Sequence, residues 1–165
     1  MQDYAKAAQS YLLTAQQGDP SAQNTLGYMY DTGQGVMKDY AEAAKWYGLA
    51  AQQGDASAQS NLGNMYAKGR GVVQDFVQAL NWYRLSAQQG NAYAQLNLGY
   101  LYSKGQGVVQ DYVKAHSWYH LSVANGIAGA VKNRDIVAKK MTPQQIADAQ
   151  KLARDCQARQ LKGCD

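Results

Sequence analysis

The feature that most constrains this chain is an internal repeat with a period of 36 residues and no gaps. Three full units run over residues 20–55, 56–91 and 92–127, after a partial unit at 3–19 and before a degenerate cap unit at 128–165. One helical pair cannot bury its own apolar surface, so such units stack and each contacts only its neighbours. The repeat therefore predicts a single extended domain over the whole chain.

Each unit is predicted to contain two helices. The first begins after Asp19, or after its equivalents Asp55 and Asn91, whose side chains can cap free backbone N–H groups. It ends at Gly33, a residue type typical of left-handed helix C-caps. A Gly-x-Gly-Val loop leads to the second helix, which closes at Gly54. The fold class predicted is an all-α solenoid of about nine helices, with a concave and a convex surface.

Aromatic and small residues recur with the period and are assigned to the architecture. Trp46 returns at positions 82 and 118, which favours a core role over a ligand role. Gly27 lies inside a helix, where glycine costs about 1 kcal/mol relative to alanine, and it returns at 63 and 99. We therefore expect close helix–helix contact at these glycines.

Charge and hydropathy exclude two classes of partner. The net charge is +4, and the excess of basic side chains lies after residue 127, too dilute for a nucleic-acid-binding face. The sequence has no run of 18 apolar residues, so membrane insertion is not expected.

The repeated string is similar to that of a known family. It reads Ala22, Leu26-Gly27, Tyr30 and Gly33-x-Gly35-Val36, followed by Asp39-Tyr40, Ala43, Trp46 and Gly54. This pattern resembles the Sel-one-like repeats, relatives of the tetratricopeptide repeats, closely over residues 3–127 and loosely over 128–165. The resemblance implies a right-handed superhelix, a bacterial adaptor role without a cofactor, and binding on the concave face formed by the first helices.

The candidate partner-binding residues are positions on the first helices that differ between repeats and share one helix face. They are Asn24, Tyr28, Asp31, Ser60, Asn64, Tyr93, Leu96 and Tyr100. Tyrosine suits such a surface because it buries a large area with few rotatable bonds. The alternative is that these are ordinary exposed positions under little constraint.

The two cysteines allow two interpretations. Along a straight helix Cys156 and Cys164 would lie about 12 Å apart, too far for a disulfide. If the chain turns back after about Leu161, the bond can form, which would favour a periplasmic or secreted protein. Cys156 could instead be a buried apolar side chain on the face of Ala149 and Ala153, and free thiols would favour the cytoplasm.

Other patterns carry little chemistry. His116 and His120 have a metal-binding spacing, but no third ligand is evident, so packing and surface roles are favoured. The Gly-x-Gly loops follow no strand, so they do not fit a phosphate-binding loop. No catalytic residue, metal or cofactor is predicted, and the protein is not expected to be an enzyme.

Three functions follow from these observations. The leading hypothesis is a non-catalytic scaffold that binds a segment of another protein on its concave face. A β-lactam or cell-wall-related hydrolase is the second, because a few cysteine-rich members of the resembled family are reported as such; their paired cysteines in every repeat are missing here. The third is an envelope structural protein that self-associates through the N-terminal edge, where the partial unit lacks its first helix.

Overall fold

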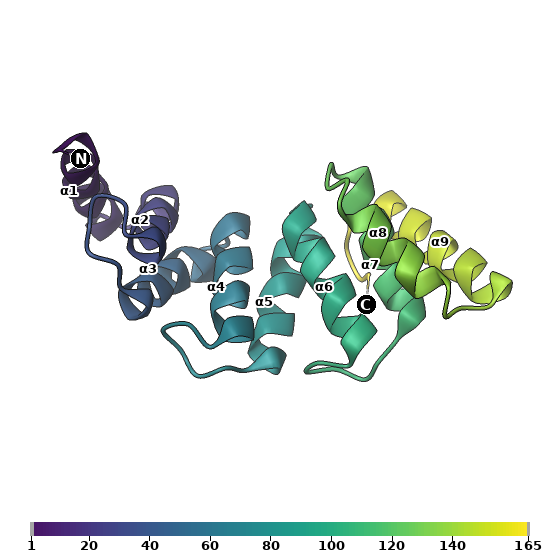
Figure 1. Ribbon diagram of the computed structural model, residues 1–165. Helices are drawn as coiled ribbons and strands as arrows, with labels where there is room; N and C mark the ends of the chain where they lie inside the picture. Colours follow the sequence, from purple (N-terminus) through teal and green to yellow (C-terminus); the bar gives the residue numbers. More distant parts are fainter. Residues whose placement is uncertain (1, 165) are drawn as a thin grey trace. The chain divides into compact units, whose positions relative to one another are not determined.

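The computed structural model describes residues 2–164, and over this range the chain forms nine α-helices and no strand (Figure 1). They are α1 (Gln2–Gln16), α2 (Pro20–Thr32), α3 (Tyr40–Gln52), α4 (Ala56–Lys68), α5 (Phe76–Gln88), α6 (Ala92–Lys104), α7 (Tyr112–Ala124), α8 (Ala130–Ala138) and α9 (Pro143–Ala158). Each full repeat contributes two helices. The all-α fold class and the predicted helix number are confirmed.

The helices belong to two compact units. The first, Met1–Asp75, contains α1 to α4, and the second, Phe76–Asp165, contains α5 to α9. The division falls between the two helices of the repeat 56–91 and does not follow a repeat boundary. The assignment of residues 1–165 to one repeat domain stays a prediction.

The first helix of each repeat begins and ends as the sequence predicts. Asp19, Asp55 and Asn91 accept a hydrogen bond from the backbone N–H three residues later, at 2.7, 2.7 and 3.0 Å. At the other end Gly33 has a φ of 79°, and its equivalents in α4 and α6 are also left-handed. These caps fix the helix length at 13 residues in all three repeats.

The second glycine of each Gly-x-Gly loop contacts the preceding repeat. A Cβ on Gly35, Gly71 or Gly107 would overlap the backbone carbonyl group of Tyr4, Tyr40 or Phe76, respectively. These carbonyl groups belong to the first turns of α1, α3 and α5. The loop therefore rests directly on the backbone of the earlier helix, and only glycine leaves room for this contact.

The mid-helix glycines pack against tyrosine rings. A Cβ on Gly27 would lie 2.7 Å from Cδ1 of Tyr47, and one on Gly99 would lie 2.7 Å from Cδ1 of Tyr119. The close helix–helix contact predicted at these two positions is confirmed. Gly48 in α3 has open space instead, so its glycine is not required by packing.

Buried glutamines join consecutive helices, a feature that we did not predict. Gln23, Gln59 and Gln95 are at most 4 % exposed, and each donates a side-chain N–H to the carbonyl oxygen eight residues earlier, at 3.1–3.2 Å. Gln95 also accepts a hydrogen bond from Asn125 at 2.9 Å. A buried amide costs free energy unless it is paired, and here the pairing links the end of one repeat to the start of the next.

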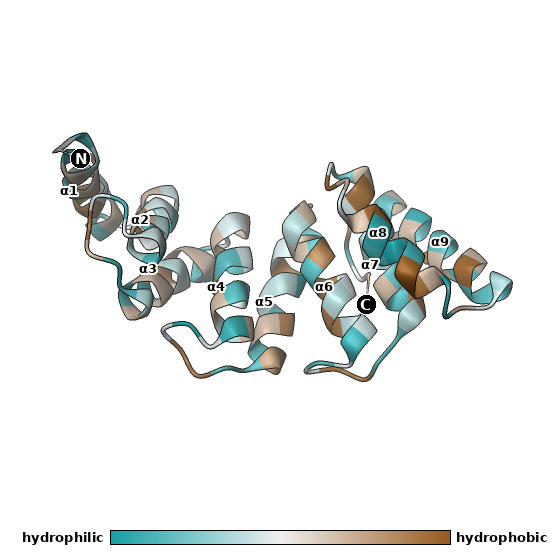
Figure 2. Ribbon diagram, viewed as in Figure 1, coloured by the Kyte–Doolittle hydropathy of each residue, from teal (hydrophilic) through white to brown (hydrophobic). Residues whose placement is uncertain are grey.

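The core is built from small and aromatic side chains. Figure 2 shows polar and apolar residues interspersed along most helices. In the second unit Leu98, Trp118 and Tyr119 are at most 2 % exposed, and Ala94 and Ala115 are fully buried. The predicted core role of Trp46 and Trp118 is consistent with this burial, since they are 8 % and 1 % exposed, whereas Trp82 is half-buried.

Candidate partner-binding surface

The tyrosines fall into two groups with different environments. Tyr47, Tyr83 and Tyr119, all on second helices, are at most 2 % exposed. Burial raises the pKa of each of these phenols, because the charged form would lose its hydration. By contrast, Tyr28, Tyr93 and Tyr100 on the first helices α2 and α6 are 52 %, 64 % and 46 % exposed. These three are the candidate tyrosines chosen from the sequence, and Tyr4 and Tyr11 on α1 are exposed as well.

In the first unit the candidate residues lie on α2 and α4. Tyr28 and Asp31 lie near the buried Tyr47, and after burial the charge of Asp31 is the next cause of the raised pKa of that phenol. The Asn61 side chain donates to Oδ1 of Asn24 at 3.1 Å and so joins the two helices. This surface is thus polar and carries an acidic group.

Ser60 is the one candidate whose side chain is buried. It is 4 % exposed, so it does not present a surface to a partner. The equivalent Asn24 and Leu96 are half-buried, which places this repeat position at the edge of the helix interface. A short serine side chain does not extend beyond that edge, whereas asparagine and leucine do. Asn64 in the same helix is half-buried.

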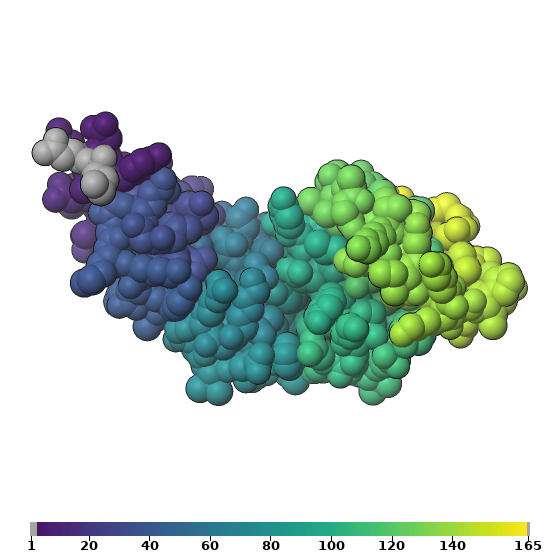
Figure 3. Space-filling view, in the orientation of Figure 1, coloured from purple at the N-terminus to yellow at the C-terminus, as the bar shows by residue number. Residues whose placement is uncertain are grey.

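In the second unit the candidate surface is more apolar. Tyr93 and Tyr100 are exposed and Leu96 is half-buried along α6. Ile136 on α8 is 48 % exposed and occupies the same repeat position as Tyr100. Figure 3 shows the surfaces of α6 and α8 side by side on the visible face. We did not select Ile136 from the sequence, although the 36-residue offset points to it even in the degenerate unit.

A cavity of about 180 Å³ opens beside this surface. Its lining residues come from α6, α7 and the segment of α8 with the residues just after it: Tyr100, Ser103, Lys104, Tyr112, Tyr119, Asn133, Ile136, Val137 and Lys140. The Lys140 ammonium donates to the Tyr112 hydroxyl at 3.5 Å and lies 5.3 Å from the centre of its ring. Lys104 and Lys140 were missed in the sequence, although lysine recurs at 68, 104 and 140.

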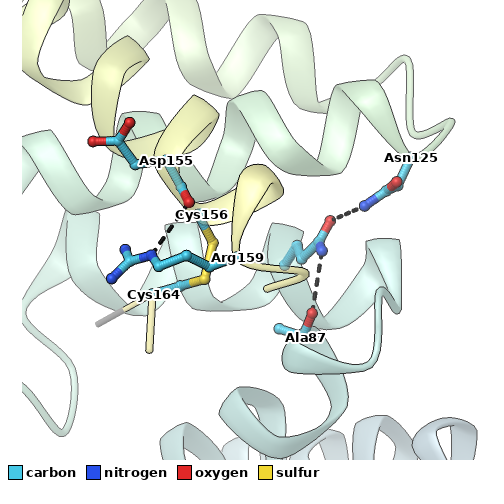
Figure 4. Close-up of a disulfide and its surroundings, with 7 residues drawn as sticks. Ala87, Asn125, Asp155, Cys156, Arg159 and Cys164 are labelled. Carbon is cyan, nitrogen blue, oxygen red and sulfur yellow. Dashed lines mark hydrogen bonds between the residues drawn. A yellow bond between two sulfur atoms is a disulfide. The ribbon is translucent and has the colours of Figure 1, made fainter. Parts of the chain in front are cut away.

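The C-terminal segment is closed by a disulfide. Cys156 and Cys164 are bonded, with their Cα atoms 5.3 Å apart, so the structure contains the first of the two arrangements considered above (Figure 4). The chain turns back at Gln160 and Leu161, which both have positive φ. Cys156 is also fully buried beside Ala149 and Ala153 in α9, so it fills the core position expected of the alternative as well.

The two histidines of α7 differ in burial, since His116 is buried and His120 is half-buried. His116 is 3 % exposed, and its Nδ1 atom has no hydrogen-bond partner among the residues that the structure describes. Burial, and then the positive charge of Arg134, lowers the pKa of both His116 and His120. Residues 2–164 contain no group of three or more His, Cys, Asp or Glu side chains that could hold a metal ion.

Nor does any helix within the described part of the chain combine the length and apolar character needed to cross a membrane. Exposed apolar side chains lie on first helices, on second helices and at loop tips. Met37, Val73 and Val109 occupy the same position of the Gly-x-Gly loop and are 86–89 % exposed.

Comparisons with known proteins agree with this architecture. The Sel1 repeat family model matches residues 20–55, 56–91 and 92–127. A crystal structure of c5321, described as a protective antigen present in uropathogenic Escherichia coli strains displaying an SLR fold, is 35 % identical with a TM-score of 0.88. That alignment covers 96 % of this chain but only 34 % of the antigen, so the chain spans about a third of its length.

A second solved structure, a Sel1 repeat protein from Oxalobacter formigenes, is 33 % identical with a TM-score of 0.75 over 93 % of this chain and 70 % of the other. No curated protein matched the chain. Sel1 repeat proteins generally act as scaffolds for protein–protein interaction and are typically non-catalytic. Three consecutive family matches, two structural neighbours of the same repeat type and the helical pairs described above lead to one conclusion: the chain belongs to the Sel1 repeat family.

Proposed function

We propose that the protein is a non-catalytic scaffold whose first helices bind a segment of another protein, on the face that becomes concave in a solenoid of this type. The observation that carries the proposal is the exposure of Tyr28, Tyr93 and Tyr100 on first helices. Exposed aromatic side chains on a rigid helix are suited to anchoring a partner, because little conformational entropy is lost on binding.

The second unit offers the better-defined part of this surface. Tyr93, Leu96 and Tyr100 follow one face of α6, and Ile136 continues it on α8. The helices beneath are held by caps and buried amides, so the surface exists before a partner arrives. Binding to such a preformed surface avoids the ordering cost that a flexible site would incur.

The proposal is tested by selecting random short peptides on the purified protein and measuring their affinity by fluorescence anisotropy. Tyr93→Ala and Tyr100→Ala are each expected to weaken binding by about tenfold or more, as for aromatic anchor residues. Leu85→Ala is the matched control, because Leu85 is 45 % exposed but lies on the second helix α5. Equal losses for all three variants, or selected peptides indifferent to all three, would contradict the assignment of the binding face.

The same proposal includes a location outside the cytoplasm, either periplasmic or secreted. Its support is the Cys156–Cys164 bond, since disulfides persist mainly in oxidising compartments. The intact mass of protein from its native host, with and without thiol alkylation, tests this. An unalkylated chain about two daltons lighter than the reduced form is expected, whereas two alkylated thiols would favour the cytoplasm.

A further inference from the structure

The cavity beside α6 combines cationic and hydroxyl donors. Two lysines, three tyrosines, one serine and one asparagine lie among its nine lining residues, and none of the residues in this set is acidic. Ile136 and Val137 supply an apolar wall on the side of α8. Asp135, which precedes Ile136 in the sequence, is paired with Arg134 at 3.0 Å. The cavity therefore has donors and positive charge without an internal counter-charge.

The lysine side chains are held at the cavity by aromatic rings. Lys140 lies 5.3 Å from the ring centre of Tyr112 and donates to its hydroxyl, and Lys104 lies 6.0 Å from the ring centre of Tyr100. Ring contacts of this kind restrict a flexible lysine without neutralising it. The ammonium groups thus remain available to an anion.

Part of this arrangement has an architectural explanation. Lys104 lies in the last turn of α6, where a cation also interacts favourably with the helix dipole. Lys140 lies beyond Ala138, where α8 ends. The helix dipole therefore does not explain why the Lys140 side chain lies over Tyr112. Repeat geometry does not demand either charge, because the first full repeat has Thr32 at the equivalent position.

The first unit supplies an internal comparison. The position of Ser103 is occupied there by Asp31, which lies near Tyr28 and Tyr47. The same place in the repeat is therefore acidic at Asp31 and uncharged at Ser103. A bound segment would meet different charge requirements along the chain, which is how a scaffold distinguishes its partner from other segments of similar hydrophobicity.

We propose that the cavity lined by Lys104, Lys140 and Tyr112 binds an acidic side chain, Asp or Glu, of the protein segment that lies on α6. This inference rests on the proposed function and adds the partner's chemistry to it. The small volume suits one carboxylate group, and Ile136 and Tyr100 at its rim accommodate an apolar neighbour of the acidic residue. Hydrogen bonds to charged groups are among the stronger ones, so the acidic residue carries a large share of the affinity.

The test uses peptides selected on the wild-type chain and resynthesised with an acetylated N-terminus and an amidated C-terminus. The only carboxylates are then side chains. Replacing the selected Asp or Glu by Asn or Gln is expected to weaken binding to the wild-type protein by about tenfold. This comparison requires no protein variant, so it holds even where a lysine substitution affects folding.

Lys104→Gln and Lys140→Gln are each expected to lower the affinity for the acidic peptide by about tenfold. The affinity for the amide peptide should stay unchanged. Lys140→Arg keeps the charge and should retain the preference for the acidic peptide. Lys139→Gln is the control, because Lys139 is an exposed neighbour that does not line the cavity. Thermal melting followed by circular dichroism establishes that each variant is folded.

The outcomes separate the inference from the function on which it rests. One outcome is that selected peptides lose affinity for the Tyr93→Ala variant and yet bind the wild-type protein equally well with Asp or Glu as with Asn or Gln. That result overturns the carboxylate site and leaves the scaffold proposal unaffected. Displacement by inorganic phosphate but not by acetate at equal ionic strength also overturns the carboxylate assignment. A selection that yields no binding peptide overturns the scaffold proposal and the inference with it.

Discussion

Gly71 and Gly54 have positive φ values, 68° and 93°, but different surroundings. A Cβ on Gly54 would meet nothing within 4 Å, whereas one on Gly71 would overlap the backbone carbonyl group of Tyr40. At Gly54 only the left-handed backbone opposes a larger residue. At Gly71 both the left-handed backbone and the neighbouring carbonyl group disfavour a larger residue. Substitutions at the two positions therefore distinguish the cost of backbone strain from the cost of close packing.

We expect Gly54→Ala to lower the free energy of unfolding by about 1–2 kcal/mol, the cost of a left-handed non-glycine residue. Gly71→Ala should lower it by a further 1–3 kcal/mol or more, because the added methyl group cannot displace a backbone carbonyl group cheaply. Urea unfolding at one pH measures both. Equal losses in the two variants would show that the contact with Tyr40 contributes nothing beyond strain.

Individual residues also mark the limit of prediction from this sequence. The caps Asp19 and Asn91 could be identified because their chemistry is local. Gln95 recurs as regularly as they do, yet its role depends on a carbonyl oxygen of another helix and on Asn125. Ser60 was placed on the exposed stripe because helical spacing defines a face but not how far the neighbouring helix covers it.

At the level of elements, α7 (Tyr112–Ala124) is the most heavily covered helix of the second unit. It packs against α6, α8 and α9, and seven of its residues are buried. One of them, His116, replaces the Ala44 and Leu80 of earlier repeats and leaves Nδ1 without a partner. A polar atom in this position lowers the stability of the helix packing rather than adding to it.

His116→Leu is expected to raise the free energy of unfolding by about 1 kcal/mol at pH 7, because an unpaired buried nitrogen is replaced by the side chain that Leu80 already provides. Burial lowers the histidine pKa in the folded state, so the unfolded chain takes up a proton first as the pH falls. Native stability should therefore decrease below the ordinary histidine pKa of about 6.5, and decrease less in the variant.

The measurement is urea unfolding at pH 7 and pH 5, with His120 retained in both proteins. His120 has a lowered pKa too, so part of the pH dependence should remain. If the free energy of unfolding fell as much between pH 7 and pH 5 in His116→Leu as in the wild type, the role assigned to this side chain would be contradicted. Arg134, Asp135 and Arg154 are the charged groups near the pair and stay constant in the comparison.

First helices of the full repeats could be predicted to the residue, whereas the second helix α3 ends at Gln52, two residues before the predicted Gly54. The terminal unit could be predicted less well. In the full repeats each position can be compared with the equivalent positions of two other repeats. After residue 127 the repeat is degenerate, and this comparison is no longer possible. Helix α8 is nine residues long, and its N-cap Gly129 makes no side-chain hydrogen bond, so it carries no local signal. Its position becomes clear only through Ala130 and Val137, which are buried as Ala94 and Leu101 are in α6.

For the whole molecule, packing is dominated by neighbours in sequence. Each helix in the first unit packs chiefly on the next, and the second unit adds α7 against α9. In repeat proteins such nearest-neighbour packing keeps the effect of a local change close to its origin. The disulfide lies at one end of this arrangement, within a sequence separation of eight residues.

Cys156→Ser with Cys164→Ser should therefore loosen only the C-terminal end. Loop-closure entropy for so short a loop corresponds to about 2–3 kcal/mol. Hydrogen exchange is expected to become faster in α9 and in the part of α7 packed against it, and to stay unchanged in α1 to α3. The exposed substitution Ala158→Ser serves as the control. Faster exchange throughout the chain would contradict the nearest-neighbour description.

The loop glycines have a consequence for how such a protein changes over generations. Gly35, Gly71 and Gly107 contact the main chain of a residue that lies 31 positions earlier, and that residue is Tyr4, Tyr40 or Phe76. The contact between the loop glycine and the preceding repeat thus does not depend on the side chain of the earlier residue. Whole repeats can be exchanged or duplicated without redesigning the joint, while the exposed positions of each first helix remain free to acquire a new specificity.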